Sequence, residues 1–192
     1  MRILFVCTGN TCRSPMAEGM FRQMAGEAGI PVEVKSAGVA AIPGSAISKH
    51  AEAVLLSRQI SGRMTSTPLN NELAEWADLI LTLTQGHKRQ VLYAFPEAAS
   101  KTFVLKEYAD DEDGTQGSRQ ELDALLAEKA LQTALGGQVT DEDRRRIMQL
   151  QRQMPVYDIS DPFGGSRADY EETAAEIHEA LVRLIRKLKA EG

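Results

Sequence analysis

The chain has 192 residues and a formal net charge of −5, a length that suits one domain with a sizeable hydrophobic core. An acidic chain without a basic tract is not expected to bind nucleic acid, and no apolar segment is long enough to cross a membrane. The charged Arg2, followed by a predicted strand, is not expected to begin a signal peptide. We therefore expect a cytoplasmic protein with neither nucleic acid nor a membrane as a partner.

The first predicted elements are a strand over residues 3–6 and a helix over residues 15–29, joined by a short loop. Residues 3–6 are all apolar, which indicates a buried strand. Ser14 is expected as the N-cap of the helix, and Pro15 as its first residue, where a missing N–H is no loss.

The connecting loop begins with Cys7 and ends with Arg13, and its chemistry predicts a cradle for a phosphoryl group. A loop from a strand to a helix N-terminus turns several backbone N–H groups toward one point, and the helix dipole adds partial positive charge there. Both effects, with the adjacent cation, favour the nucleophilic thiolate form of Cys7. The planar guanidinium of Arg13 can hold two phosphoryl oxygens at once.

The other loop residues are expected to shape this cradle. Ser14 can donate a hydrogen bond to the sulfur of Cys7, Asn10 can bond within the loop, and Gly9 permits backbone angles that other residues avoid. The predicted phosphate-binding residues are Thr8, Gly9, Asn10, Thr11, Cys12 and Ser14.

Cys12 is the only cysteine besides Cys7, and two interpretations of it remain open. It is either a small buried hydrophobic residue or a second thiol that traps oxidised Cys7 as a reversible disulfide. Two cysteines in one loop and three scattered histidines do not suggest a metal site, so we expect neither a metal nor another cofactor.

The elements that follow alternate between strand and helix, a pattern that predicts a parallel α/β sheet with right-handed crossovers. In open sheets of this type the site lies beyond the carboxyl ends of the strands, where the Cys7 loop falls. Strands are predicted over residues 32–35, 78–83 and 102–105, and helices over 49–58, 87–94 and 170–189, with residues 36–38 as a turn.

Residues 110–156 interrupt this alternation before the last helix. An acidic loop at 110–114 precedes a helix with Leu122 on its apolar side; Gly136 and Gly137 end that helix, and Thr140 begins a capping box for a second helix. We predict a helical hairpin inserted into a single domain of residues 1–192. A lid, a docking element for a partner and a surface ornament all remain possible roles.

The segment 161–165, Asp-Pro-Phe-Gly-Gly, supplies a candidate for the proton donor that phosphoryl transfer requires. Asp161 has the carboxyl group, Pro162 makes the loop rigid, and Phe163 offers an aromatic wall. An ordinary Asp-Pro turn is the alternative. Asp158 is a nearby competitor, but nothing in its surroundings favours it.

This chain resembles the low-molecular-weight protein tyrosine phosphatases, whose signature is Cys-(x)5-Arg-Ser on a loop between a strand and a helix. The resemblance implies that family's fold, a four-stranded parallel sheet with helices on both faces. It also implies a cysteinyl-phosphate intermediate, with Cys7, Arg13 and Asp161 as catalytic residues and no metal. The matching segments are residues 7–14, 16–18, 36–38, 77–80 and 161–163, so that most of the chain outside residues 109–156 is covered.

One position departs from the family's pattern. A histidine after the third helix braces the loop asparagine in many relatives, and this chain has Arg63 in the corresponding segment. The brace for Asn10 is therefore expected to differ or to be lost. His87 is too distant to be an obvious substitute, and we interpret it as an ordinary residue at a helix start.

Thr11 and Phe163 are the predicted specificity residues. Tyrosine phosphatases of this family usually have an apolar residue at the position of Thr11, whereas a threonine there resembles the protein arginine phosphatase branch. Phe163 followed by glycine also resembles that branch. The guanidinium of phosphoarginine can stack on Phe163 and pair with Asp161. The resemblance thus implies a phosphatase for phosphoarginine in proteins, with phosphotyrosine as the alternative.

Two other classes fit less well. Arsenate reductases share the loop but need further cysteines downstream, and residues 78–95 contain none. A phosphoprotein-binding module would need neither the thiolate of Cys7 nor the acid of Asp161. The expected partners are phosphorylated proteins, with a possible docking partner for residues 110–156.

Overall fold

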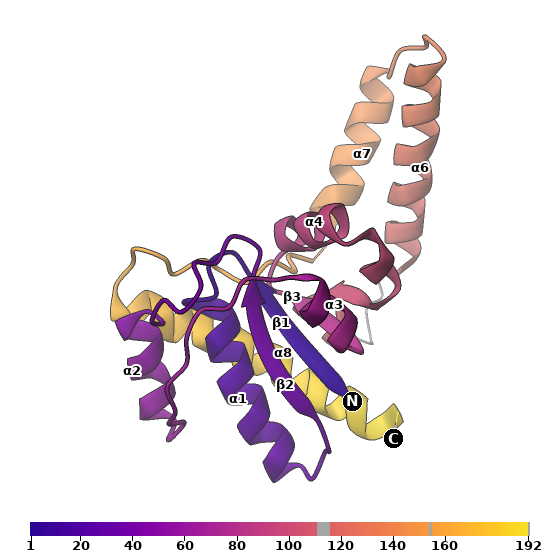
Figure 1. Cartoon of the computed structure of the whole chain (residues 1–192). Coiled ribbons are helices and arrows are strands. Elements are labelled where there is room, and N and C mark those ends of the chain that lie inside the picture. Colours follow the sequence, from indigo (N-terminus) through magenta and orange to yellow (C-terminus); the bar gives the residue numbers. More distant parts are fainter. Residues whose placement is uncertain (111–115, 154, 192) are drawn as a thin grey trace. The chain divides into compact units, whose positions relative to one another are not determined.

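A four-stranded, all-parallel sheet in the order β2-β1-β3-β4 forms the centre of the α/β fold (Figure 1). The computed structural model describes residues 1–110, 116–153 and 155–191. The strands are β1 (Arg2–Cys7), β2 (Glu33–Gly38), β3 (Leu79–Thr82) and β4 (Thr102–Val104). The helices are α1 (Arg13–Glu27), α2 (Lys49–Ser57), α3 (Asn71–Trp76), α4 (Gln85–Ala94), η1 (Pro96–Lys101), α5 (Leu105–Ala109), α6 (Gln116–Ala134), α7 (Asp141–Gln153) and α8 (Arg167–Glu191).

Strand β1 is central because its side chains are apolar on both faces of the sheet. Ile3 and Phe5 pack into a core with residues of α1, α2, α5 and α8, and the rings of Phe5 and Phe21 meet edge to face at 5.6 Å. Leu4 and Val6 point the other way, into a smaller core with residues of α3, α4 and η1. Helices therefore cover both faces, as predicted, which buried parallel strands require.

The fold class is confirmed, but several element bounds differ from the prediction. Strand β2 continues through residues 36–38, which were predicted to form a turn, because Phe5 to Cys7 of β1 pair with them in register. The short helices α3 and α5 were not predicted. Helix α8 begins at Arg167 and α4 at Gln85, each earlier than the apolar pattern indicated.

The chain divides into two compact units, residues 1–111 with 157–192, and residues 112–156. Helices α6 and α7 belong to the second unit. Thr140 and Asp143 form the predicted capping box at the start of α7, with Asp143 N–H donating to Thr140 Oγ1 at 3.1 Å. Lys129 of α6 pairs with Asp143 at 3.1 Å, so ion pairs link the two helices. Within the described parts of the chain, no helix is long and apolar enough to cross a membrane.

Candidate active site

Cys7 is the last residue of β1, and its side chain lies at the start of the loop that leads into α1. The residue is 3% exposed, and Ser14 Oγ lies 3.0 Å from its sulfur. Asn10 Nδ2 donates to the same hydroxyl at 2.8 Å, and the proton of Ser14 has the sulfur and, at 3.3 Å, the carbonyl oxygen of Ala37 as acceptors within reach. The predicted contact between Ser14 and Cys7 is present.

The predicted capping role of Ser14 is wrong. Helix α1 begins at Arg13 with Cys12 in the N-cap position, and no side chain caps it. The hydroxyl of Ser14 faces Cys7 and Asn10 instead, so it is unavailable to the helix N-terminus. The first-turn N–H groups are thereby left for an anion in the loop.

Asn10 braces the loop from within. Its backbone has a positive φ of 52°, which few residues other than glycine and asparagine adopt readily, and the residue is 1% exposed. Besides its bond to Ser14, Nδ2 donates to Ser36 Oγ at 2.8 Å, and Oδ1 accepts from Thr67 N at 2.7 Å. Both donors and the acceptor of the amide are therefore used. Ser36 and Thr67 supply the brace, and Arg63 has no part in it.

Gly38 allows β2 to approach this loop closely. A Cβ atom on Gly38 would lie 2.5 Å from the carbonyl oxygen of Thr8 and 2.8 Å from the backbone nitrogen of Asn10. Both atoms belong to the loop backbone, so no side-chain rotation could relieve the clash. A side chain at this position is thus incompatible with the shape of the loop.

We expect the Gly38→Ala variant to lose about 1–3 kcal/mol of unfolding free energy, as overpacked sites do, and most of its phosphatase activity. Denaturant unfolding and phosphate release would measure the two losses. Gly26→Ala is the matched control, since a Cβ there meets nothing within 4 Å and alanine favours the helix. A Gly38→Ala protein as stable and active as the control would show that the close approach is unimportant.

Arg13 and Asp161 meet across the site although they lie far apart in the sequence. Arg13 Nη2 donates to Asp161 Oδ2 at 2.9 Å; the side chain of Arg13 is 6% exposed and that of Asp161 is 54% exposed. Arg13 Nε is buried and donates to no atom of the described residues. A phosphoryl group in the loop would satisfy this donor, because oxygens of an anion are the acceptors that a guanidinium binds best.

The predicted site residues line one pocket of about 380 Å³, except Asn10 and Ser14, which support the loop from behind. Phe163 lies at this pocket and is 79% exposed. Sequence reasoning missed Ile42, which is 72% exposed at the same pocket, together with Ala40 and Ser45. The sequence did contain a signal for this segment, because residues 40–45 follow the carboxyl end of β2, and the site loops of such sheets lie at the carboxyl ends of the strands. The lining consists of Cys7, Thr8, Gly9, Thr11, Cys12, Arg13, Ala40, Ile42, Ser45, Asp161 and Phe163.

His87 also reaches the loop, contrary to its interpretation as an ordinary helix-start residue. Its Nε2 lies 2.8 Å from Thr8 Oγ1, and its ring is held by Thr84, the N-cap of α4. The residue is 5% exposed. Burial, with the positive charge of Arg13, lowers the pKa of His87 to about 4.

Two further predicted candidates have other surroundings. Cys12 is 6% exposed and its sulfur lies 3.1 Å from the hydroxyl of Tyr170, so burial and a redox role are both compatible with its position. Asp158, the alternative candidate for the proton donor, accepts a hydrogen bond from Gln85 N at 2.7 Å and is not among the residues that line the pocket.

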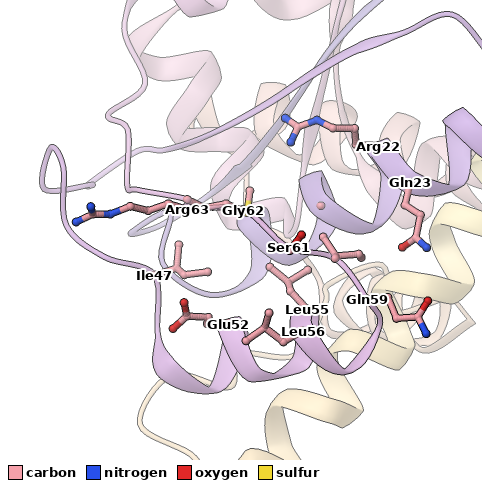
Figure 2. Close-up of a pocket in the computed structure, with 13 residues that line it drawn as sticks. Arg22, Gln23, Ile47, Glu52, Leu55, Leu56, Gln59, Ser61, Gly62 and Arg63 are labelled. Atoms are coloured by element: carbon pink, nitrogen blue, oxygen red, sulfur yellow. The ribbon is translucent and has the colours of Figure 1, made fainter.

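A larger cavity of about 760 Å³ lies between α1, α2 and residues 59–64 (Figure 2). Leu55 and Ile47 form apolar parts of its wall, and Arg22 and Arg63 lie at its edge (Figure 2). None of the predicted catalytic residues lines it. Throughout the described residues, no group of three or more His, Cys, Asp or Glu side chains could hold a metal ion. The predicted catalytic residues Cys7, Arg13 and Asp161 lie at the smaller pocket.

Comparisons with known proteins agree with the geometry of this pocket. A family model described as "Low molecular weight phosphotyrosine protein phosphatase" matches residues 2–120. A protein-arginine-phosphatase of Bacillus subtilis strain 168 is 35% identical over 189 residues, 98% of this chain and 97% of that protein. One from Geobacillus stearothermophilus is 36% identical over 192 residues, 99% and 97% of the two chains. A low molecular weight protein-tyrosine-phosphatase PtpB of Staphylococcus epidermidis is 29% identical over 96% of each chain.

Solved structures of related phosphatases have the same fold as this chain. A crystal structure of a YwlE mutant from Bacillus subtilis superposes with a TM-score of 0.73 at 35% identity, covering 98% of this chain and 99% of that one. A YwlE arginine phosphatase, a cysteine-to-serine mutant with a phosphorylated active-site serine, also has a TM-score of 0.73 at 35% identity. It covers 98% of this chain and 96% of its own.

Proposed function

The chain belongs to the low molecular weight phosphotyrosine protein phosphatase family, a family of cysteine-based enzymes, and from this premise we propose that it hydrolyses phosphoarginine in proteins. One observation carries the proposal: relatives named protein-arginine-phosphatase match 98–99% of the chain at 35–36% identity. The pocket supports it, because Thr11, Phe163 and the Arg13–Asp161 pair line the same pocket as Cys7.

In the first step, the thiolate of Cys7 attacks phosphorus in line with the leaving nitrogen. An S–P bond forms and the P–N bond breaks, while Asp161 gives its proton to the departing guanidine nitrogen. Arg13 and the backbone N–H groups of the loop stabilise the charge on the phosphoryl oxygens. The products are a cysteinyl-phosphate and a neutral or protonated arginine side chain.

In the second step, water replaces the sulfur. Asp161, now a carboxylate, accepts a proton from the attacking water, an O–P bond forms, and the S–P bond breaks. Inorganic phosphate leaves and Cys7 returns as the thiolate. The hydroxyl of Ser14, at 3.0 Å from the sulfur, stabilises the thiolate as it departs.

The Arg13–Asp161 ion pair has to open when a phosphoryl group binds. A bound phosphoryl group presents more negative charge to Arg13 than one carboxylate does, so the guanidinium exchanges its partner; the released Asp161 takes up a proton from solvent and carries it to the leaving atom. Asp161 can move because 54% of its side chain is exposed and Phe163 N is its only other donor among the described residues, at 3.2 Å from Oδ1.

Phosphoarginine fits the pocket by shape and charge. Its planar guanidinium can stack on the exposed ring of Phe163, with the carboxyl group of Asp161 beside the leaving nitrogen. Thr11 adds a hydroxyl where a branched apolar residue would favour an aromatic ring. Phosphotyrosine is the second candidate, favoured by the tyrosine phosphatase PtpB among the relatives.

The Thr11→Ile variant tests this choice of substrate. We expect wild-type protein to release phosphate faster from phosphoarginine peptides than from matched phosphotyrosine peptides. The substitution should lower that ratio about tenfold or more, because the polar group is lost and apolar contact with a ring is gained. Comparison of kcat/KM for the two peptides measures the ratio, with Thr11→Ser as the control that keeps the hydroxyl. A wild-type preference for phosphotyrosine would overturn the arginine assignment and leave the cysteine chemistry in place.

We also infer a cytoplasmic location and phosphorylated proteins as substrates. We further propose that residues 1–192 act as one phosphatase domain that contains helices α6 and α7 as an insertion, for which the roles of lid, docking element and surface ornament all stay open. The acidic net charge of −5 supports the expectation that nucleic acid is not a partner.

A further inference from the structure

A chain of hydrogen bonds leads from the start of α4 to the loop, and the two catalytic steps leave it without a role. Thr84 Oγ1 accepts from the backbone N–H of His87 at 3.1 Å and lies 2.9 Å from Nδ1 of the same residue. On the other side of the ring, Nε2 lies 2.8 Å from Thr8 Oγ1. Thr8 lines the pocket that contains Cys7 and Arg13.

The direction of these bonds is assigned from the donors and acceptors within reach. Thr84 Oγ1 accepts the backbone N–H of His87, and Nδ1 is an acceptor within reach of its own proton. We assign Thr84 as the donor to Nδ1, which places the ring proton of neutral His87 on Nε2. Nε2–H then donates to Thr8 Oγ1, so the proton of the Thr8 hydroxyl is free to point elsewhere.

We propose that His87 is a positioning residue that turns the hydroxyl proton of Thr8 into the pocket, where it is donated to a phosphoryl oxygen of the bound substrate. The inference rests on the proposed phosphatase function and deepens it. Phosphoarginine brings phosphoryl oxygens into the pocket as hydrogen-bond acceptors. The hydroxyl of Thr8 can therefore donate its proton to one of these oxygens. Thr8 thereby joins Arg13 and the loop N–H groups in holding the phosphoryl group.

The neutral form of His87 is the form that this arrangement needs. The residue is 5% exposed, and burial followed by the charge of Arg13 lowers its pKa to about 4, while Asp161 and Asp158 oppose the shift. Nδ1 can then act as an acceptor throughout the neutral pH range. A protonated ring would donate from both nitrogens and break the bond from Thr84.

This depressed pKa also has a consequence for stability. Because the folded pKa lies below the ordinary value of 6.5, the unfolded chain binds more protons between pH 6.5 and about 4. The contribution of His87 to stability is therefore full above pH 6.5 and is lost as pH falls toward 4. The wild type should lose unfolding free energy more steeply over this window than a variant without His87.

Two variants of His87 separate positioning from simple packing. In His87→Gln the side-chain amide can reach Thr8 in place of Nε2–H, whereas the shorter amide of His87→Asn reaches only Thr84. We expect His87→Asn to bind inorganic phosphate about tenfold more weakly and to lower kcat by a similar factor, the worth of one hydrogen bond to a charged group. His87→Gln should restore most of both. The control is His178→Asn, an exposed histidine on α8, which should match wild type.

A double-mutant cycle with Thr8→Val tests whether His87 acts through Thr8. If it does, the double variant Thr8→Val/His87→Asn is no weaker than Thr8→Val alone, both in phosphate affinity measured by calorimetry and in kcat. Effects that multiply, or a His87→Asn protein with wild-type phosphate affinity, would overturn the proposal. Side-chain ¹⁵N NMR that finds the ring proton on Nδ1 would overturn it as well.

These outcomes are distinct from a failure of the proposed function. A wild-type protein that binds phosphate but releases none from phosphoarginine or phosphotyrosine peptides would defeat the function. The phosphate affinities of the His87 and Thr8 variants would still decide the positioning role.

Discussion

Replacement of Cys7 by serine is expected to abolish turnover while leaving the fold and the phosphate-binding loop intact. A serine hydroxyl holds its proton at neutral pH and is a far poorer nucleophile than a thiolate, and the side chain that contacts this position is the neutral hydroxyl of Ser14 at 3.0 Å. Loss of a covalent nucleophile lowers kcat by about 10⁴-fold or more in enzymes of this kind of mechanism. Phosphate release from a phosphoarginine peptide would measure the loss.

Binding provides the matching control for Cys7→Ser. Arg13, Asn10 and the loop backbone remain in place, so the affinity for inorganic phosphate and the thermal midpoint should stay close to those of the wild type. Turnover by Cys7→Ser at a rate near that of the wild type would exclude Cys7 as the nucleophile. Loss of the fold would instead appear in the thermal midpoint.

The Asp161→Asn variant is expected to have the second largest effect. The amide keeps the size of the side chain but cannot supply a proton, and guanidine nitrogen leaves poorly without one. General acid catalysis contributes about 10²–10⁴-fold, so kcat with a phosphoarginine peptide should fall by that factor. The fall should be smaller with para-nitrophenyl phosphate, whose leaving group needs little protonation.

Asp158→Asn is the control for this loss. Asp158 accepts from Gln85 N at the start of α4, so its replacement should affect stability and leave the chemistry nearly unchanged. Asp161→Asn should also bind inorganic phosphate at least as tightly as wild type, because the carboxylate no longer competes for Arg13. Equal losses of kcat in the two variants, or no dependence on the leaving group, would contradict the role of Asp161 as the acid.

The local part of the site could be predicted from the sequence, because its chemistry depends on near neighbours. Cys7, Arg13 and Ser14 lie on one loop between a strand and a helix, and the contact between Ser14 and Cys7 follows from that arrangement. The same local reasoning failed for the cap of α1. It assigned the hydroxyl of Ser14 to the helix N-terminus, whereas burial beside Cys7 and Asn10 gives it stronger partners.

The remaining parts of the site depend on contacts between distant segments. The brace of Asn10 comes from Ser36 and Thr67, and the neighbour of Thr8 is His87, 79 positions along the chain. Ile42 lies at the pocket because β2 runs to Gly38 beside Cys7. Each of these contacts follows from strand register and loop path, which residue spacing alone does not specify.

The measurement that tests the central claim most directly is rapid mixing of wild-type protein with a phosphoarginine peptide, followed by a quench and mass spectrometry of protein fragments. We predict one phosphoryl group on the fragment that carries Cys7, formed at the rate at which the peptide loses its phosphate and absent from Cys7→Ala. A phosphoryl group on another residue, or peptide hydrolysis without any phosphorylated protein, would contradict a covalent mechanism at Cys7. Labelling by phosphotyrosine peptides alone would contradict phosphoarginine as the substrate.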